Sequence, residues 1–378
     1  MSFIWEGRRV VVCVGTGGVG KTTTAAAIAL AAASQGLRTL LMTIDPARRL
    51  ANALGVADLG NVERELPPEH FAPHGVELRA PLWAMMPDSK RIFDDLVERT
   101  SPNEETRQRI LRSRIYQHFS SALAGAHEYA AVQKLQEVYS AGRYDLIVLD
   151  TPPAQNAVDF LDAPSRMLDF LETETLQWLL KPYVLSGKFS VRVLDLGSSF
   201  LLRTLGKLAG VETLREIADF LIAFSALYDG FRERSRQVKD LLASDDIAFV
   251  LVTGPQPSQQ RAMLQFRDEL HAEGLRVRCV IANRVRHLAA TPELEKRFGE
   301  HVRRVLTAHA PDTADRIVDI VRGIGEEIRL AALDCQTIAA LGEKLEGTPI
   351  LTLPELPTDV HDMTGLARLQ RAFESRGT

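Results

Sequence analysis

The residues best suited to chemistry lie together at 15–22, where the sequence reads GTGGVGKT. This stretch matches the pattern GxxxxGK[ST] completely. Glycines allow backbone N–H groups to turn inward around phosphate oxygens, and the start of the following helix adds partial positive charge. In this pattern Lys21 reaches the β- and γ-phosphates and Thr22 ligates Mg²⁺. We therefore predict a phosphate-binding loop (P-loop) whose nucleotide contacts come from Gly15, Thr16, Gly17, Gly18, Val19, Gly20, Lys21, Thr22 and Thr23.

The same letters also satisfy a dinucleotide-binding pattern. Gly15, Gly17 and Gly20 match GxGxxG, and Asp45 ends the next predicted strand, where a dinucleotide fold places its ribose-binding acid. The discriminating feature is the Lys21-Thr22 pair, which a triphosphate site needs and a dinucleotide turn does not. A nucleoside triphosphate site is therefore favoured over an oxidoreductase, and over a glycine-rich turn that contains GKT by chance.

A second signal is the apolar run 146–149 (LIVL), which ends in Asp150. An acid in this place holds Mg²⁺ through a water in triphosphate sites, although an aspartate that ends a buried strand often only caps a turn or helix. Together with the P-loop, Asp150 is predicted to be a Mg²⁺ ligand. The following Pro152 and Pro153 stiffen the loop toward Asn156, so that a shift dependent on the γ-phosphate can move the next helix as a unit.

A third signal is Asp45, which stands at a predicted strand tip before a proline in TIDPARRL. This carboxylate is a candidate for holding the attacking water in line with the γ-phosphate. Its other reading is an N-cap for the helix that contains Arg48 and Leu50, and both roles are compatible. Asp45 and Lys21 are the candidate catalytic residues.

Short apolar runs separated by helix-length segments must position these groups. Such runs are typical of strands buried on both faces of a parallel sheet, and they predict an α/β fold of the P-loop NTPase type, with a mostly parallel central sheet flanked by helices. The predicted strands are 9–14, 39–44, 77–85, 146–149, 248–253, 278–282 and 349–353.

Two stretches interrupt this alternation and predict an inserted all-helical subdomain at 87–140 and 164–243. The ATPase core would then comprise 1–86, 141–163 and 244–378. In the first insertion, Ser101 to Glu104 reads as a capping box with Pro102 at the first helical position. The second holds leucine-rich and aromatic-rich helices, whose apolar stripes fit either a core or a client-binding groove. Its only methionine between Phe160 and Phe231 is Met167.

Composition restricts location and partners. The chain has 45 Lys plus Arg against 49 Asp plus Glu in 378 residues, a net charge of −4 that gives no overall attraction to nucleic acid. The apolar stretch Ala25 to Ala33 is too short to span a bilayer, so stable membrane insertion is not expected. The N-terminus leads into a strand without a secretory signal pattern, which predicts a cytoplasmic protein. We expect the three cysteines, Cys13, Cys279 and Cys335, to be buried and reduced.

Three motifs together, GTGGVGKTT, TIDPARRLANALG and VLDTPPAQNAVDFLDAP, resemble the deviant Walker-A ATPases of the arsenite-pump (ArsA) and tail-anchored-protein-targeting family. This family shares a broader class with the ParA and MinD partition ATPases. The resemblance implies ATP and Mg²⁺ as ligands, with the roles for Lys21, Thr22, Asp45 and Asp150 given above. It further implies that Asn283 and Pro354 frame the adenine, with Glu355 in the same C-terminal loop.

The sequence departs from that family at the second P-loop position. Thr16 stands where the family has a lysine that reaches across a dimer to the other subunit's phosphates, and a hydroxyl cannot supply this charge. Slow basal hydrolysis is therefore expected. The family's arsenite-binding cysteines and dimer-bridging CxxC have no equivalents here. Because the chain has one GxxxxGK[ST] motif, a facing-dimer mechanism needs a second subunit, either a second copy or a paralogous ATPase.

The leading hypothesis is a cytosolic ATPase whose Mg-ATP-driven dimer closing rearranges the helical insertion to bind or release an apolar protein or lipid-like client. A ParA- or MinD-like positioning ATPase is one alternative. Leu366, Leu369 and Phe373 form the apolar stripe that a membrane-binding terminal helix needs, although such a stripe more often packs on its own fold. A weakly hydrolysing nucleotide-binding scaffold, partnered by a paralogous ATPase, is the other alternative.

Overall fold

The structure is a computed structural model that describes residues 2–44, 49–56, 59–101, 103–114, 116–117, 126–151, 228–286, 297, 299–301, 304–305, 314–360 and 362–374. Its centre is an eight-stranded sheet with the order β3-β4-β2-β5-β1-β6-β7-β8. All neighbouring pairs are parallel except β3 and β4. The strands are β1 (Val10–Val14), β2 (Thr39–Thr43), β3 (Arg64–Leu66), β4 (Leu82–Met85), β5 (Leu146–Asp150), β6 (Ile247–Thr253), β7 (Val277–Val285) and β8 (Ile350–Pro354).

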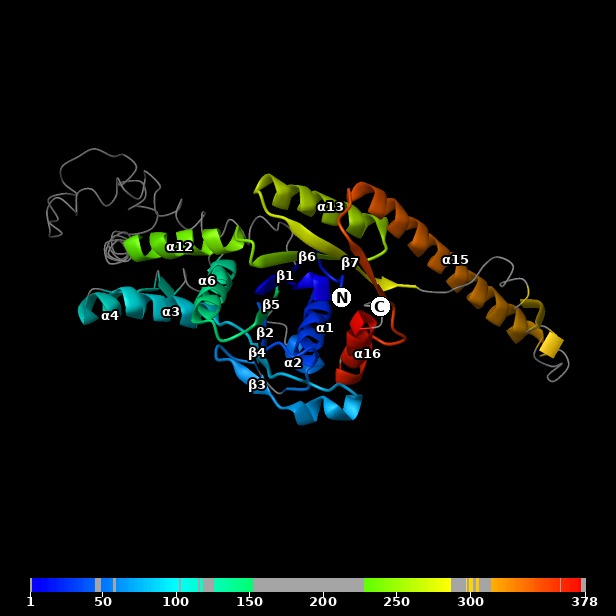
Figure 1. Cartoon of the computed structure of the whole chain (residues 1–378), viewed down its shortest axis with the longest axis horizontal. Helices are drawn as coiled ribbons and strands as arrows, with labels where there is room; N and C mark the ends of the chain where they lie inside the picture. Colours follow the sequence, from blue (N-terminus) through cyan, green and yellow to red (C-terminus); the bar gives the residue numbers. More distant parts are fainter. Residues whose placement is uncertain are drawn as a thin grey trace, which may run out of the picture.

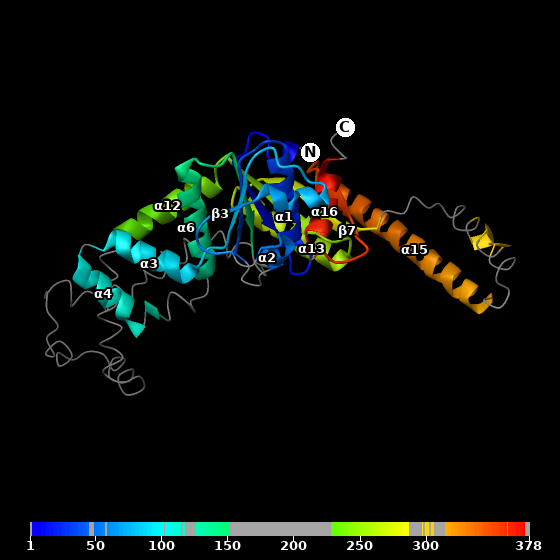
Figure 2. The same ribbon diagram turned by 90° about the horizontal axis from the view of Figure 1, so that it is seen from below.

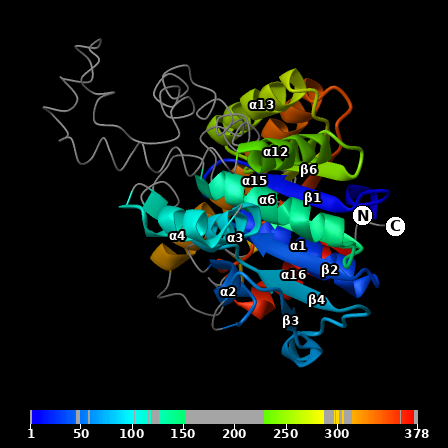
Figure 3. The same ribbon diagram turned by 90° about the vertical axis from the view of Figure 1, so that its left-hand side faces the viewer.

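Helices cover both faces of this sheet (Figures 1 and 3). One face carries α1, α2 and α16, and the other carries α6, α12, α13 and the C-terminal end of α15. The described helices are α1 (Lys21–Ser34), α2 (Arg49–Ala53), α3 (Ser89–Thr100), α4 (Glu104–Arg112), α6 (Ala126–Ala141), α12 (Tyr228–Leu242), α13 (Pro257–Ala272), α15 (Ala314–Lys344) and α16 (Met363–Glu374), with short 3₁₀ turns η1 (Ser2–Ile4), η2 (Pro68–His70) and η3 (Ala72–His74). The predicted α/β sheet is therefore confirmed.

The central strands owe their position to their composition. Every residue of β1, β2, β5 and β6 is buried, as the uninterrupted apolar runs predict. The alanine-rich helix α1 buries eleven of its fourteen residues, from Lys21 to Ala33, between the sheet and α16. Because these side chains are small, the helix packs closely on the sheet. This packing holds the N-terminus of α1 near the end of β1.

The two ends of the molecule differ in make-up (Figures 1 and 2). At one end lie α3, α4 and α6, which the chain inserts between β4 and β5, beside α12, which precedes β6. At the other end α15 extends away from the sheet. Residues 152–227 lie outside the described residues, including most of the second predicted insertion with Met167.

Three local predictions need correction. The edge strand β3 was not predicted, because Arg64-Glu65-Leu66 is short and largely polar, as edge strands often are. The strand predicted at 77–85 begins only at Leu82. The capping box was wrong: Ser101 closes α3 by donating its backbone N–H to Val97, and α4 is capped by Asn103, whose Oδ1 accepts from Thr106 N at 2.8 Å.

The terminal helix α16 packs inside its own fold. Leu366, Leu369 and Phe373 are almost fully buried, and α16 lies against α1. Turning each of these side chains out into water would cost about 1.5–3 kcal/mol. The packing interpretation of this stripe is confirmed, which removes the main feature that favoured a membrane-binding terminal helix. No described helix is long and apolar enough to cross a bilayer.

Candidate nucleotide-binding site

The predicted P-loop joins β1 to α1 at the carboxyl end of the sheet, with Gly15 to Gly20 between them. Gly18 and Gly20 adopt the left-handed backbone conformation, with φ of 78° and 87°, which favours glycine. Gly15 is needed for a different reason. A Cβ atom there would lie 2.2 Å from the carbonyl oxygen of Val252 in β6, so only glycine permits this close approach of two backbones.

Lys21 starts α1 and turns back over the loop. Its side chain is 6% exposed, and Nζ donates to the carbonyl oxygen of Thr16 at 2.9 Å. The neighbouring Gly17 and Gly18 are exposed, and Thr22 is half-buried. The ammonium group is therefore held beside the open part of the loop, within the turn whose N–H groups would surround a phosphate.

Asp150 ends β5 beside this loop. It is fully buried and lies in register with Cys13 on β1 and with Thr43 on β2. The hydroxyl of Thr43 donates to Oδ2 of Asp150 at 2.7 Å, which fixes the carboxylate. Thr151 Oγ1 donates to the Cys13 carbonyl at 2.8 Å and ties β5 to β1. Burial, followed by the negative charge of Asp150, raises the pKa of the Cys13 thiol, so this thiol stays protonated and uncharged.

Asn283 lies near the end of β7, where the register with β8 shifts and Arg284 has a φ of 58°. Such a bulge redirects side chains next to functional sites. Asn283 is 5% exposed, and its Nδ2 donates to the carbonyl oxygen of Val19 in the P-loop at 2.9 Å. This contact to the loop is additional to the adenine role that the resemblance implies for Asn283. A Cβ at Gly20 would lie 2.3 Å from the same Nδ2, so the loop rests closely on this amide.

The other two residues predicted near the adenine follow β8. Pro354 pairs with Val285 of β7, which places it beside the strand that carries Asn283. Glu355 is exposed, and its Oε2 lies 3.0 Å from Nε of Arg286. Arg286 is also hydrogen-bonded to Asp334 of α15: its backbone N–H donates to Oδ2 of Asp334 at 3.1 Å. One arginine thus joins the ends of β7 and β8 to the long helix α15.

The predicted switch residues are described only in part. Asp45 and Arg48 lie outside the described residues, as do Pro152, Pro153 and Asn156. The residue before Asp45 is described: Ile44 donates its backbone N–H to the carbonyl oxygen of Asp150 at 3.1 Å. The two strands that precede the predicted switches, β2 and β5, are therefore neighbours in the sheet, and β5 also pairs with β1.

Sequence reasoning missed three groups that support the site. They are the Thr43 hydroxyl on Asp150, the Asn283 amide on the P-loop, and Arg286 beside Glu355. The position of Thr43 at the end of a buried strand was an available signal, since a lone hydroxyl there needs a partner. The other two contacts depend on a bulge and on a distant helix, for which the sequence contains no local pattern.

The donor set fits Mg²⁺ and a polyphosphate. The hydroxyl of Thr22 and the carboxylate of Asp150 are hard oxygen ligands of the kind that Mg²⁺ takes beside nucleotide phosphates. Lys21 and the left-handed glycines supply charge and inward-facing N–H groups. Asp150 ends β5, which pairs with β1 in the sheet. The glycines, Lys21 and Thr22 lie in the loop after β1 and at the start of α1.

Comparison with known proteins decides which family this site belongs to. The family model described as anion-transporting ATPase matches residues 8–301, which include the P-loop, Asp45, Asp150 and Asn283. This chain belongs to the anion-transporting ATPase family. The resemblance to the ArsA and tail-anchored-protein-targeting proteins is thereby confirmed. The matched range ends before α15, β8 and α16.

Individual relatives agree with this membership. An uncharacterised protein of Streptomyces coelicolor is 31% identical over 281 residues, covering 73% of this chain and 62% of that protein. The putative arsenical pump-driving ATPase 1 of Aquifex aeolicus is 23% identical over 286 residues, covering 73% of this chain and 63% of the relative. The ATPase get3 of Schizosaccharomyces japonicus is 27% identical over 152 residues, covering 40% and 42%. The matches thus span less than two thirds of the length of these relatives.

Proposed function

We propose that this protein is a cytoplasmic Mg-ATP-dependent ATPase that works as a dimer and couples nucleotide state to its helical insertions. The observation that carries the proposal is the P-loop. Gly18 and Gly20 have the required conformation, Lys21 is folded over the loop, and Asp150 is fixed by Thr43 beside it. Membership in the anion-transporting ATPase family supports the same activity.

Each residue has a defined role in this proposal. The N–H groups of 15–23 and the ammonium of Lys21 bind the phosphates, and Thr22 and Asp150 hold Mg²⁺, Asp150 through a water. Bound Mg²⁺ neutralises charge on the β- and γ-phosphates. Asp45 orients the attacking water. Asn283, Pro354 and Glu355 line the adenine side, where Asn283 also supports the loop through Val19.

The coupling rests on chain connectivity. The core of 1–86, 141–163 and 244–378 holds the nucleotide. The helical part at 87–140 leads into β5, the strand that ends in Asp150, and the part at 164–243 follows this strand. A change at Asp150 therefore passes directly into the second insertion. We propose that dimer closing on ATP rearranges this helical part to bind or release an apolar protein or lipid-like client. With one P-loop per chain, the second subunit is another copy or a paralogous ATPase.

A second candidate is a nucleotide-binding scaffold that hydrolyses ATP only weakly. Thr16 favours it, since this position offers a hydroxyl in place of the lysine that relatives direct across the dimer. The scaffold and the ATPase differ in one measurable ratio: a scaffold binds ATP tightly but turns it over very slowly, whereas the ATPase does both.

The experiment compares ATP binding and turnover in Asp45→Asn and in the wild type. The variant should keep its ATP affinity and lose most of its turnover, because water positioning matters chiefly in the transition state. Asp245→Asn is the matched control, since Asp245 is an exposed carboxylate before β6, at the opposite end of the sheet from the P-loop. Equal ATP turnover in Asp45→Asn and the wild type would contradict a catalytic role for Asp45 and would favour its interpretation as a helix N-cap. A wild type that does not bind Mg-ATP would refute the proposed function.

A further inference from the structure

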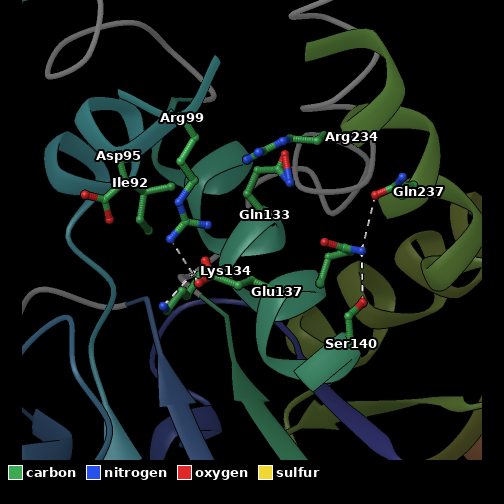
Figure 4. Close-up of a pocket in the computed structure, with 10 residues that line it drawn as sticks. Ile92, Asp95, Arg99, Gln133, Lys134, Glu137, Ser140, Arg234 and Gln237 are labelled. Atoms are coloured by element: carbon green, nitrogen blue, oxygen red, sulfur yellow. Dashed lines mark hydrogen bonds and ion pairs between the residues drawn. The ribbon is translucent and has the colours of Figure 1, made fainter. Parts of the chain in front are cut away.

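A second polar pocket lies away from the P-loop, between α3, α6 and α12 (Figure 4). We call it the three-helix pocket, and its volume is about 270 Å³. None of its lining residues belongs to the predicted nucleotide site. Because α3 and α6 precede β5 while α12 follows it in the chain, the pocket is a seam between two separately inserted helical segments.

Each of the three helices contributes one cation to this pocket. They are Arg99 of α3, Lys134 of α6 and Arg234 of α12. Figure 4 shows Arg99 descending from α3 while Arg234 reaches in from α12 on the other side of the pocket. Only Lys134 is mostly buried, with a side chain 15% exposed. Three positive charges from separate helices are thus brought to one cavity.

The acids of the pocket balance these cations incompletely. Glu137 is shared, with its oxygens 3.4 Å from Arg99 and 3.6 Å from Lys134. Arg234 has no carboxylate within ion-pair distance in the part of the chain that the structure describes. The remaining acid, Asp95, is exposed on the rim. The pocket therefore presents more positive than negative charge, and Arg234 is the cation that is left over.

The neutral lining is also polar. The Gln136 amide donates to Ser140 Oγ at 3.1 Å and to Gln237 Oε1 at 3.4 Å, which links α6 to α12 across the pocket floor. Ile92 is the one aliphatic side chain among the described lining residues. The amide and guanidinium groups of the lining are hydrogen-bond donors of the kind that bind an oxyanion.

We propose that the three-helix pocket binds a small multivalent oxyanion, either phosphate or a di- or tricarboxylate. Arg234 and Arg99 hold the anion from opposite helices, and Lys134 supplies a third charge from α6. Two guanidinium groups that face one cavity repel each other, and an anion between them converts this repulsion into attraction. Occupancy ties α12 to α3 and α6, and so fixes the seam between the two insertions.

The test is calorimetric titration of the full chain with sodium phosphate and, separately, with sodium citrate, at constant ionic strength and without Mg²⁺. Because the P-loop also binds phosphate, each titration is repeated in Lys21→Ala, where binding at the pocket should persist. Arg234→Gln should weaken that binding about tenfold or more, since a charge-assisted contact is lost. Arg236→Gln is the matched control: Arg236 lies on the same helix, outside the pocket, and pairs with Glu233.

The outcomes are distinct. Saturable binding of either anion that survives Lys21→Ala and falls in Arg234→Gln, but not in Arg236→Gln, supports the site and identifies its chemistry. Arg99→Gln is a second variant, should Arg234→Gln lower the unfolding temperature. No binding of either anion in Lys21→Ala overturns the proposal. Equal losses in Arg234→Gln and Arg236→Gln overturn it too, because they indicate a general charge effect. None of these results depends on ATP hydrolysis.

Discussion

The P-loop and the three-helix pocket are both proposed to bind negatively charged groups, but by opposite means. The P-loop uses the backbone of consecutive residues and one lysine, Lys21. Gly15 lies where a Cβ would meet backbone, and Gly18 and Gly20 have the left-handed conformation that favours glycine. The three-helix pocket uses side chains only, from two helices that precede β5 in the chain, α3 and α6, and one that follows it, α12. The first is rigid because its backbone conformation is fixed, and the second is only as rigid as the packing of its helices.

The two sites should therefore respond to substitutions in different ways. At Gly15 of the P-loop a single added methyl group would meet the backbone of Val252, so a substitution there acts through geometry. In the three-helix pocket the side chains already reach solvent, so substitutions act through charge. The P-loop also has a threonine where a second cation would stand, whereas the pocket has a cation in excess. The predictions below test these contrasts.

The largest expected effect comes from adding the missing cation to the P-loop. Under the proposed ATPase function, Thr16→Lys should raise the turnover of a homodimer by up to about 10³-fold, because a well-aimed cation contributes several kcal/mol to phosphoryl transfer. Steady-state ATP hydrolysis measures this effect, and wild type mixed with Thr16→Lys shows whether one lysine per dimer is enough. Fast wild-type hydrolysis that the substitution leaves unchanged would mean that another residue, such as Arg48 or Arg49, already supplies the charge.

The next effect tests whether the P-loop depends on backbone geometry. Gly15→Ala should destabilise the protein by about 1–3 kcal/mol and abolish ATP binding, because the new Cβ would lie 2.2 Å from the Val252 carbonyl oxygen. Urea unfolding and calorimetry measure the two effects. Gly60→Ala is the control, since nothing lies within 4 Å of a Cβ at that position. Similar results for the two variants would contradict the argument from close backbone approach.

The smallest effect concerns the strands beneath the P-loop. Cys13 and Cys279 are buried, whereas Cys335 is exposed, which corrects the expectation that all three are buried. Burial raises the pKa of Cys13, and it raises the pKa of Cys279 to about 12. One thiol per native chain should therefore react with a thiol reagent at pH 8, and three in denaturant. Rapid reaction of all three native thiols would show that the sheet opens.

The same pKa shifts have a defined sign in the pH dependence of stability. Both folded-state pKa values lie above that of an unfolded thiol, so the unfolded chain loses these protons first as the pH rises. The contribution of each thiol to stability is therefore fully present below the unfolded pKa and is lost as the pH rises through its folded-state pKa, which is about 12 for Cys279. In Cys279→Ala the loss of stability at high pH should be smaller.

The features that could be predicted from the sequence are those encoded by neighbouring residues. Uninterrupted apolar runs predicted the central strands, and GTGGVGKT predicted the loop after β1, because each pattern fixes its own local structure. Asp150 followed from its place after such a run. The short strand β3 was missed because Arg64 and Glu65 are exposed, and pairing with β4 makes it a strand.

Other features depend on contacts between distant residues. Asn103 rather than Ser101 caps α4, because Ser101 is already used to end α3. Asn283 reaches Val19 only because a bulge turns the end of β7. The charge of the three-helix pocket exists only once Arg234 of α12 is packed beside α3 and α6. No window of sequence contains these relations.

The most direct test of the proposed nucleotide site is calorimetric titration of Mg-ATP into the wild type, Lys21→Ala and Lys239→Ala. Lys239 is an exposed lysine of α12 and serves as the matched control. The wild type and Lys239→Ala should bind one ATP per chain. Lys21→Ala should bind about ten to a hundred times more weakly or not at all, since a charge-assisted phosphate contact contributes about 1.5–3 kcal/mol. Unchanged ATP affinity in Lys21→Ala would contradict the assignment of the P-loop as the nucleotide site.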